Sequence, residues 1–318
     1  MNILILSCGT RYKLVEYFKA CYLIDKVVVT DCSTQAPALY IADKYYIVPR
    51  MLEEGYMEAL LEICVKEEIN FVLPLQEEEL LLTAKNRVYF ESIGAVPIVS
   101  DYEKVLLCKD KYALNTYLND NGISAVHTIL AKDYLDSNSD IPKLFVKPRM
   151  GAGSIDTFSV TSRRLLEALV EETEDELIVQ PCILGKEYGV DVYVDLLSNE
   201  VITCFCKEKL RMRAGETEKS LSVRNTDIEK LVKDAVLLLG LKGPLDVDVM
   251  EENGIYYILE INPRFGGGYP HAYMCGISFP EYIANNGANI PNTVSDNFYM
   301  ENVLAMKYSE ILIDKSKT

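Results

Sequence analysis

Oxygen-bearing side chains alternate along two apolar stretches near the end of the sequence, separated by a turn at residues 251–254. Because successive side chains of a strand point to opposite faces, Asp246 and Asp248 share one face, and Glu260 and Asn262 share a face on the next strand. Antiparallel pairing would bring Asp248 close to the other two. Converging oxygens suit Mg2+, although on these residues alone a surface hairpin with hydrated acids explains the pattern equally well.

A positive charge and a glycine run follow this predicted hairpin. Arg264 lies two residues after the last oxygen donor and would place a guanidinium beside a bound metal. Three consecutive glycines, Gly266, Gly267 and Gly268, could leave backbone amides open to a substrate carboxylate. His271 comes next, and although a single histidine is more often structural than catalytic, this one is close in sequence to the predicted metal site.

The composition is that of a globular protein and argues against several classes of partner. Of 318 residues, 49% are hydrophobic and 25% are charged, and the formal net charge is −16. Such a charge argues against a nucleic-acid partner, whose phosphates need Lys and Arg. No run is long enough to span a membrane, and the short apolar opening lacks the charged start of a signal peptide. Nine scattered Cys and two His predict reduced thiols in a cytoplasmic protein rather than a zinc site.

The first hundred residues alternate between strand-like and helix-like patterns. Strands are expected at 1–7, 26–30, 45–48, 70–74 and 95–99, and the clearest helices at 57–67 and 77–89. This alternation predicts a doubly wound α/β unit with a parallel sheet. Asp31 could bind a ribose in a dinucleotide fold, but the first turn has one glycine, Gly9, in place of GxGxxG, so NAD binding is a weak alternative.

Two lysines and a glycine loop that could hold phosphate lie in the middle of the chain. Lys111 belongs to a helix predicted within residues 101–122. Lys147 lies near the end of a strand predicted at 142–148, and the small residues of the loop 149–154 would let backbone amides approach phosphate oxygens. An ordinary hairpin loop is the alternative, but the position of Lys147 at the mouth of the loop favours phosphate binding.

Further polar residues lie on strands predicted beyond this loop. The strand at 177–183 runs into an extended linker that could present backbone groups to an adenine edge. Glu187, at the start of the following strand, could hold ribose hydroxyls. A basic cluster that includes Lys209 and Arg211 precedes a polar loop, and it is either solvated or in contact with an anionic substrate or a phosphate.

Local signals predict the remaining elements. Asn225 or Thr226 caps a helix that ends at Gly240. Residues 133–141 are polar and irregular, so a loop is expected there. Residues 302–313 are predicted to form one more strand.

In chain order these signals resemble the ATP-grasp superfamily. The resemblance is carried by a Lys after an acid on a helix, a Lys-Pro strand before a glycine loop, the extended linker, a Gly-x-Glu strand start and the Glu-Ile-Asn-Pro-Arg segment. The most similar branch contains the large subunit of carbamoyl-phosphate synthetase and stand-alone amino-acid ligases. It implies a Rossmann-like α/β domain at 1–100 and an ATP-grasp domain at 101–318, with an ATP-lid subdomain at about 112–178 and a catalytic subdomain at about 179–318.

The resemblance also implies roles for individual residues. ATP contacts are implied for Lys111, Lys147, Gly151, Gly153, Ser154, Gln180, Pro181, Cys182, Ile183 and Glu187. Magnesium ligands are implied to be Asp248, Glu260 and Asn262, and Arg264 and Lys147 are implied to stabilise the reacting phosphoryl group. Substrate contacts are expected from Lys209, Arg211, Gly266, Gly267, Gly268 and His271.

Two positions depart from the pattern of the relatives. Many relatives begin the adenine linker with an acid where this chain has Gln180, whose amide oxygen could still accept a hydrogen bond from adenine. The carbamoyl-phosphate branch has Asn and Gln in place of Asp246 and Asp248. Asp246 and Asp248 keep metal binding plausible, but the difference argues against the reaction of carbamoyl-phosphate synthetase itself.

The activity implied by the resemblance is ATP-dependent ligation. A carboxylate would attack the γ-phosphate of ATP to give an acyl phosphate, and an amine would then displace phosphate. ATP and Mg2+, with Mn2+ as an option, are the implied cofactors, small-molecule acids and amines the substrates, and a homodimer one possible assembly. The alternatives are a nucleotide-binding module without ligase activity, a carbamoyl-phosphate-synthetase-like enzyme that uses bicarbonate, and a component of a biotin-dependent carboxylase.

Overall fold

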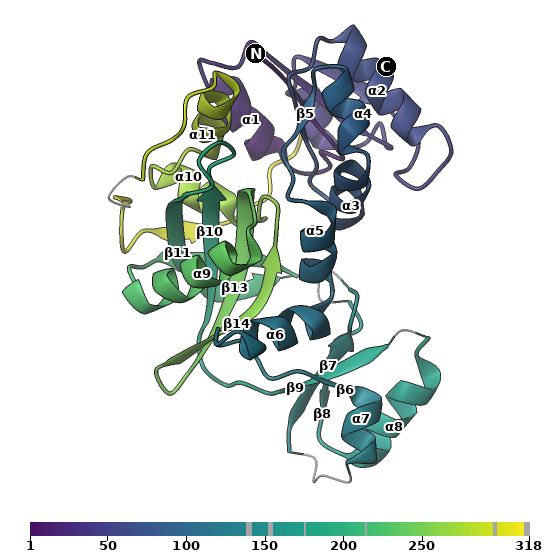
Figure 1. The fold of residues 1–318 in the computed structure, drawn as a ribbon, viewed down its shortest axis with the longest axis vertical. Coiled ribbons are helices and arrows are strands. Elements are labelled where there is room, and N and C mark those ends of the chain that lie inside the picture. Colours follow the sequence, from purple (N-terminus) through teal and green to yellow (C-terminus); the bar gives the residue numbers. More distant parts are fainter. Residues whose placement is uncertain (138–141, 152–154, 175, 214, 295–297, 315–318) are drawn as a thin grey trace.

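The chain forms three β-sheets with helices packed around them, as the computed structural model shows (Figure 1). The structure describes residues 1–137, 142–151, 155–174, 176–213, 215–294 and 298–314. A parallel sheet lies in the N-terminal part, a small antiparallel sheet projects at the opposite end of the molecule, and a larger antiparallel sheet lies between them (Figure 1).

The N-terminal domain is built on a five-stranded sheet in the order β3-β2-β1-β4-β5. Its strands are β1 (Asn2–Ile5), β2 (Lys26–Asp31), β3 (Lys44–Ile47), β4 (Phe71–Leu73) and β5 (Val96–Pro97). The intervening helices are α1 (Tyr12–Ala20), the 3-10 helix η1 (Pro37–Tyr40), α2 (Tyr56–Lys66), α3 (Glu77–Lys85) and α4 (Arg87–Ser92). All pairings of this sheet are parallel, which confirms the doubly wound α/β unit expected from the sequence.

Apolar side chains cover both faces of this parallel sheet. One face packs Leu4 and Val28 against α2 and α4. The other face packs Ile3 and Ile5 against α1 and against two helices from the far end of the chain, α10 (Tyr269–Met274) and α11 (Phe279–Gly287). The core of the N-terminal domain is therefore continuous with the C-terminal part of the chain, which fixes the position of the first domain against that part.

Two helices lead from the first domain to the small antiparallel sheet. They are α5 (Tyr102–Lys109) and α6 (Lys111–Asp120), and Asp110 separates them because its side chain accepts a hydrogen bond from the Ala113 amide at 3.0 Å and caps α6. The small sheet has the order β6-β9-β7-β8. Its elements are β6 (Ile129–Leu130), α7 (Ala131–Asp136), β7 (Leu144–Pro148), β8 (Phe158–Val160), α8 (Arg163–Glu172) and β9 (Leu177–Pro181).

The large antiparallel sheet has six strands in the order β14-β13-β10-β11-β12-β15. The strands are β10 (Glu187–Val194), β11 (Val201–Arg213), β12 (Glu216–Ser222), β13 (Gly243–Glu252), β14 (Ile255–Asn262) and β15 (Leu304–Met306). Helix α9 (Thr226–Leu239) connects β12 to β13. Asn225 caps this helix by accepting hydrogen bonds from two backbone amides at 3.1 Å, and Gly240 ends it at a φ of 62°.

The two faces of the six-stranded sheet differ in composition. On one face Val247, Ile261 and Val190 pack against α9 and α6 in a buried apolar cluster. The residues that alternate with them, such as Asp191 and Asp248, are polar and point to the other face. One strand pattern therefore supplies both a hydrophobic core and a surface that can hold charged ligands.

Four sequence-based expectations are wrong in detail. The helix expected at 77–89 is divided into α3 and α4 at Asn86, whose side-chain amide donates to Leu82 O at 2.8 Å. The expected loop at 133–141 begins within helix α7. Most of the basic cluster around Lys209 and Arg211, and of the polar loop expected after it, belongs to strands β11 and β12, because pairing with neighbouring strands extends both beyond their apolar residues. Of the strand expected at 302–313, only β15 forms, where β12 supplies a partner.

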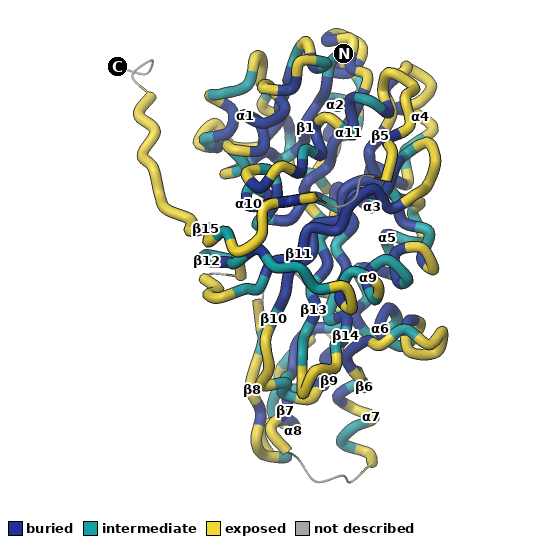
Figure 2. Tube along the Cα trace, turned by 90° about the vertical axis from the view of Figure 1, so that its left-hand side faces the viewer, coloured by how far each residue is buried: buried dark blue, intermediate teal, exposed yellow. Residues whose placement is uncertain are grey.

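The end of the chain projects from the body of the protein. Beyond β15 the described residues are exposed and leave the sheet as an extended segment (Figure 2). In the described part of the chain, no helix combines the length and the apolar character that crossing a membrane requires.

Candidate active site

The β13–β14 hairpin brings together the three predicted metal ligands. Asp248 lies directly opposite Glu260, and Asp246 lies opposite Asn262. The turn at Asn253 and Gly254, with φ values of 54° and 80°, has the left-handed geometry of a two-residue hairpin. Hairpin pairing therefore places the two carboxylates and the amide on one face, as the alternation in the sequence predicts.

The carboxylates on this face are crowded and partly buried, and the side chain of Asp248 is 13% exposed. Burial raises the pKa of Asp248 to about 7, and the charges of Asp246, Glu260 and Glu187 act in the same direction. The opposing cation is Lys209, whose Nζ lies 2.6 Å from Asp248 Oδ1 and 2.8 Å from Glu187 Oε1. A divalent cation bound here would neutralise this excess of negative charge.

These residues fit a magnesium ion. Asp248 and Glu260 offer carboxylate oxygens, and Asn262 donates its amide nitrogen to Glu260 Oε1 at 3.2 Å, which leaves its side-chain oxygen for a cation. Within the described residues, no group of three or more His, Cys, Asp or Glu side chains is placed to hold a metal. The amide oxygen of Asn262 is accordingly needed as the third protein donor.

Two lysines approach the same carboxylates from the small sheet and from α6. Burial lowers the pKa of Lys147 to about 8; Glu260 opposes this effect and Lys111 reinforces it. Burial of Glu260 opposes its ionisation, but the charges of Lys147 and Lys111 outweigh burial and hold its pKa below the usual value. Lys111 Nζ also donates to Gly151 O, so the lysine contacts the glycine loop. Two cations next to a metal site are suited to the phosphate chain of a nucleotide.

The end of β9 occupies the place expected for the adenine linker. Gln180 is buried and donates from Nε2 to Thr128 Oγ1 at 2.8 Å, and Asn115 donates to the same hydroxyl at 3.0 Å. This leaves Gln180 Oε1 as the acceptor that an adenine amino group would need. Pro181 ends β9, and the chain continues through Cys182, whose backbone amide donates to Lys143 O at 3.3 Å.

Two more predicted ATP contacts can be placed relative to this linker. Ile183 is the residue after Cys182, and Glu187 begins β10, where Lys209 holds its carboxylate. Gly153 and Ser154, expected to close over the phosphates, lie outside the described residues.

Arg264 lies between the hairpin and the first domain. Its guanidinium is 3.9 Å from Asp246 Oδ2 and 3.8 Å from Glu77 Oε1 of α3, and it donates to Phe265 O at 3.0 Å. Glu77 lines a small cavity together with Lys111, Glu260 and Asn262. Burial raises the pKa of Glu77, and this residue of the first domain lines one side of the cavity.

The three glycines after Arg264 pass close over side chains of the polar face. A Cβ on Gly266 would lie 2.5 Å from an oxygen of Asp246, and one on Gly268 would lie 2.9 Å from Lys207 Cε. A Cβ on Gly267 would lie 2.8 Å from Arg11 Nη1. Side chains are excluded at this turn because the backbone lies against charged groups.

The other expected substrate residues have different surroundings. Lys209 belongs to the carboxylate cluster, whereas Arg211 is exposed and pairs with Glu218 at 2.8 Å. Both ring nitrogens of His271 contact protein groups, Ser220 Oγ at 2.8 Å and Val303 O at 3.0 Å. Burial lowers the pKa of His271 to about 4, so the neutral ring ties α10 to the edge of the sheet.

Several residues of the polar face were missed in the sequence. Lys207 and Asp191 form a fully buried ion pair under the glycine turn, and Arg11 reaches the same turn from the loop before α1. The available signal for Asp191 was its position four residues after Glu187 on the same strand, which places both acids on one face. Lys207 belongs to the basic cluster noted in the sequence, but its pairing with Asp191 was not expected, and no local signal marks Arg11, because its neighbours come from other elements.

Two family models match the chain in consecutive segments. Residues 3–99 match the PylC-like N-terminal domain, and residues 108–268 match the ATP-grasp domain. The second match covers half of the sequence, from the end of α5 to the glycine turn. The chain belongs to the ATP-grasp family. It is an ATP-dependent ligase of this family.

Curated relatives and solved structures agree with this assignment. The D-alanine–D-alanine ligase of Francisella philomiragia is 23% identical over 69% of this chain and 81% of its own length. The carbamoyl phosphate synthase large chain of Thermoplasma acidophilum is 26% identical over 70% of this chain, but the match spans only 23% of that protein. The structure of N5-carboxyaminoimidazole synthetase from Staphylococcus aureus, complexed with ADP, superposes with a TM-score of 0.73 at 19% identity, covering 92% of this chain and 78% of that one.

Proposed function

We propose that the protein joins a carboxylic acid to an amine, with an amino acid among its substrates, and releases ADP and phosphate. The observation that carries the proposal is the convergence of Lys111 and Lys147 on the carboxylates of Asp248 and Glu260. A protein that merely bound nucleotide would not need Arg264 at the same cluster. The relation to a D-alanine–D-alanine ligase supports an amino acid as a substrate.

The first step would transfer the γ-phosphoryl group. An oxygen of the substrate carboxylate attacks the γ-phosphorus, the bond to the ADP oxygen breaks, and an acyl phosphate forms. Lys147 and Arg264 would stabilise the negative charge that spreads over the transferring oxygens. Magnesium held by Asp248, Glu260 and Asn262 would supply further charge neutralisation. Glu187, at the start of β10, would bind the ribose.

The second step would form the new C–N bond. The amine nitrogen attacks the acyl carbon, the bond to the phosphate oxygen breaks, and phosphate leaves with the electron pair while the amine proton passes to phosphate or solvent. Because an acyl phosphate reacts readily with water, the site must exclude water during this step. Glu77 and α3 of the first domain, which close one side of the cavity, support this requirement.

The experiment that tests the proposal is a substrate screen by ADP and phosphate release. Amino acids are supplied singly and in pairs with Mg2+ and ATP, and mass spectrometry identifies the product. We expect amino-acid-dependent release with stoichiometric formation of an amide. ATP binding without substrate-stimulated release would favour a nucleotide-binding module, and release that depends only on bicarbonate would favour carbamoyl-phosphate-type chemistry.

We also propose that the enzyme works in the cytoplasm on free small molecules. None of the nine cysteines, all within the described residues, forms a disulfide, and the buried Cys204 and Cys206 pack in the same apolar core. A reducing compartment is compatible with this state. A homodimer remains part of the proposal, and its mass in solution would test it.

A further inference from the structure

Two guanidinium groups, those of Arg11 and Arg264, lie at the glycine turn without a carboxylate at hydrogen-bonding distance. Arg264 lies 3.8 and 3.9 Å from its nearest carboxylate oxygens, and Arg11 Nη1 lies 3.6 Å from Glu216 Oε1. All three separations exceed hydrogen-bonding distance. Among the described residues, the side chain of Arg11 makes no hydrogen bond. Its donors therefore stay available although the group is only 26% exposed.

A structural arginine elsewhere in the chain shows the difference. Arg149 donates from Nε and Nη2 to both oxygens of Asp110 at 2.8 and 2.6 Å, and from Nη1 to Glu176 at 2.7 Å. These bonds raise the pKa of Arg149, whereas burial lowers the pKa of Arg11; the charge of Glu216 opposes this effect and that of Arg264 reinforces it. A desolvated guanidinium next to a second cation, with its donors free, is suited to bind an anion.

An anion bound by Arg11 would lie away from the phosphates of ATP. Arg11 precedes α1 in the first domain, and its nearest acid, Glu216, is on β12. Strand β12 lies on the far side of β13, β10 and β11 from β14, which carries the metal ligand Glu260. Arg11 lies against Gly267 of the glycine turn, close enough to Arg264 and Asp246 for their charges to act on it. An anion bound at Arg11 would thus belong to a substrate group other than the one that receives the phosphoryl group.

We propose that Arg11 binds the free carboxylate of the amino acid that serves as the amine substrate. The inference rests on the proposed ligase function and adds a specificity-determining residue from the first domain. A planar guanidinium accepts a carboxylate through two parallel hydrogen bonds. With its carboxylate on Arg11, the amino acid would have its nitrogen directed across Gly267 toward the acyl phosphate held near Arg264.

The test compares an amino acid with its carboxamide in wild type and in Arg11→Met. In the wild type, the amino acid found by the screen should stimulate ADP release at a much lower KM than the carboxamide. In Arg11→Met we expect the KM for the amino acid to rise about tenfold or more, because a pair of charge-assisted hydrogen bonds is lost. The KM for the carboxamide and the KM for ATP should stay unchanged. Arg11→Lys should give an intermediate KM, because it keeps the charge but loses the fork.

Two further variants control for indirect effects. Lys13→Met removes an exposed cation of the same helix, paired with Glu16 at 2.8 Å, and should leave every KM unchanged. Gly267→Ala places a methyl group against Arg11 Nη1 and should raise the KM for the amino acid in the direction of Arg11→Met.

The outcomes separate the inference from the function on which it rests. An unchanged KM in Arg11→Met, or an equal rise for amino acid and carboxamide, would overturn the role of Arg11 while leaving the ligase activity established by the wild type. Absence of amino-acid-stimulated release by the wild type would overturn the proposed function itself. Should Arg11→Met fail to fold, the same comparison in Arg11→Lys and Gly267→Ala decides the question.

Discussion

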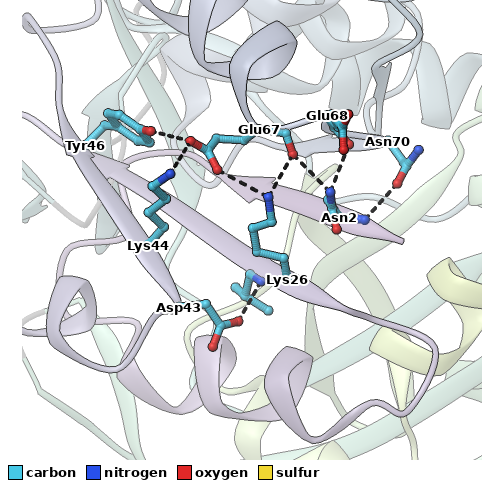
Figure 3. A network of polar contacts seen from close by, with 9 residues as sticks. Asn2, Lys26, Asp43, Lys44, Tyr46, Glu67, Glu68 and Asn70 are labelled. Carbon is cyan, nitrogen blue, oxygen red and sulfur yellow. Dashed lines mark hydrogen bonds and ion pairs between the residues drawn. The ribbon is translucent and has the colours of Figure 1, made fainter.

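Two carboxylates of this protein, both largely shielded from solvent, have opposite electrostatic surroundings. In the first domain Glu67 accepts hydrogen bonds from Lys44 at 2.6 Å, Lys26 at 3.3 Å and the Tyr46 hydroxyl (Figure 3). Burial opposes ionisation of Glu67, but these partners outweigh it and lower its pKa to about 2. In the catalytic sheet, burial and neighbouring acids instead raise the pKa of Asp248 to about 7.

The contrast distinguishes a structural polar network from a ligand site. The network around Glu67 contains more positive than negative groups at one carboxylate and needs nothing from outside the protein (Figure 3). The cluster around Asp248 gathers acids with a single closely paired lysine, Lys209. Unfavourable charge in a folded protein is retained where a ligand compensates it, as at other sites with strongly shifted pKa values.

The comparison would fail most clearly if a carboxylate of the catalytic cluster could be removed without loss of activity. Glu260→Ala should lower ADP release by about 1000-fold, which corresponds to several kcal/mol of transition-state stabilisation lost with a metal ligand. Initial-rate assays measure ADP release, and circular dichroism checks that the variant is folded. Release of ADP at the wild-type rate would refute the role of this cluster.

The ion pair of Lys207 and Asp191 is buried on the polar face and already has its partner within the protein. We therefore expect it to contribute to stability, as the Glu67 network does. Lys207→Met leaves the carboxylate of Asp191 buried without its cation and should lower the free energy of unfolding by about 3–5 kcal/mol. Adding Asp191→Leu removes the unpaired charge and should recover much of that loss. Urea denaturation gives both values, and a double variant no more stable than the single one would contradict the pairing.

Glu67→Gln should affect stability and leave catalysis unchanged. Loss of the charged hydrogen bonds should lower the free energy of unfolding by about 1.5–3 kcal/mol at pH 7, with ADP release per folded molecule unaltered. Chemical denaturation with a parallel activity assay makes the measurement. A large fall in kcat at full folding would show that the first-domain network is coupled to the site.

The same variant gives a prediction for pH. Because the pKa of Glu67 is lower in the folded state, its contribution is present above the usual glutamate pKa of about 4.5 and is lost as pH falls toward about 2. The difference in stability between wild type and Glu67→Gln should therefore shrink across this window. A difference that stays constant between pH 6 and pH 2.5 in urea melts would contradict the lowered pKa.

The smallest effect is expected on the opposite face of the catalytic strand. Ile261 lies between Glu260 and Asn262 in sequence but points into the apolar cluster under α9. Ile261→Val should lower the free energy of unfolding by about 0.5–1.5 kcal/mol and leave kcat and KM unchanged. This variant is the matched control for Glu260→Ala, and a kinetic defect would show that packing on the apolar face governs the site.

Local patterns in the sequence predicted much of the framework. The alternation of Asp246 and Asp248 with valines specified a hairpin with one polar face, and Asn225 and Gly240 marked both ends of α9. The parallel sheet followed from alternating strand and helix signals. These features depend on neighbours within a few residues, which is why one sequence suffices to predict them.

Tertiary structure alone decided which charges meet. Lys209 was expected at a substrate loop, yet strand pairing places it between Glu187 and Asp248, and Arg11 reaches the glycine turn from more than 250 residues away in sequence. The sequence by itself determined which residue types are present and which of them share a strand face. Their charge balance depends on burial and on partners supplied by other strands and another domain, and the fold as a whole sets both.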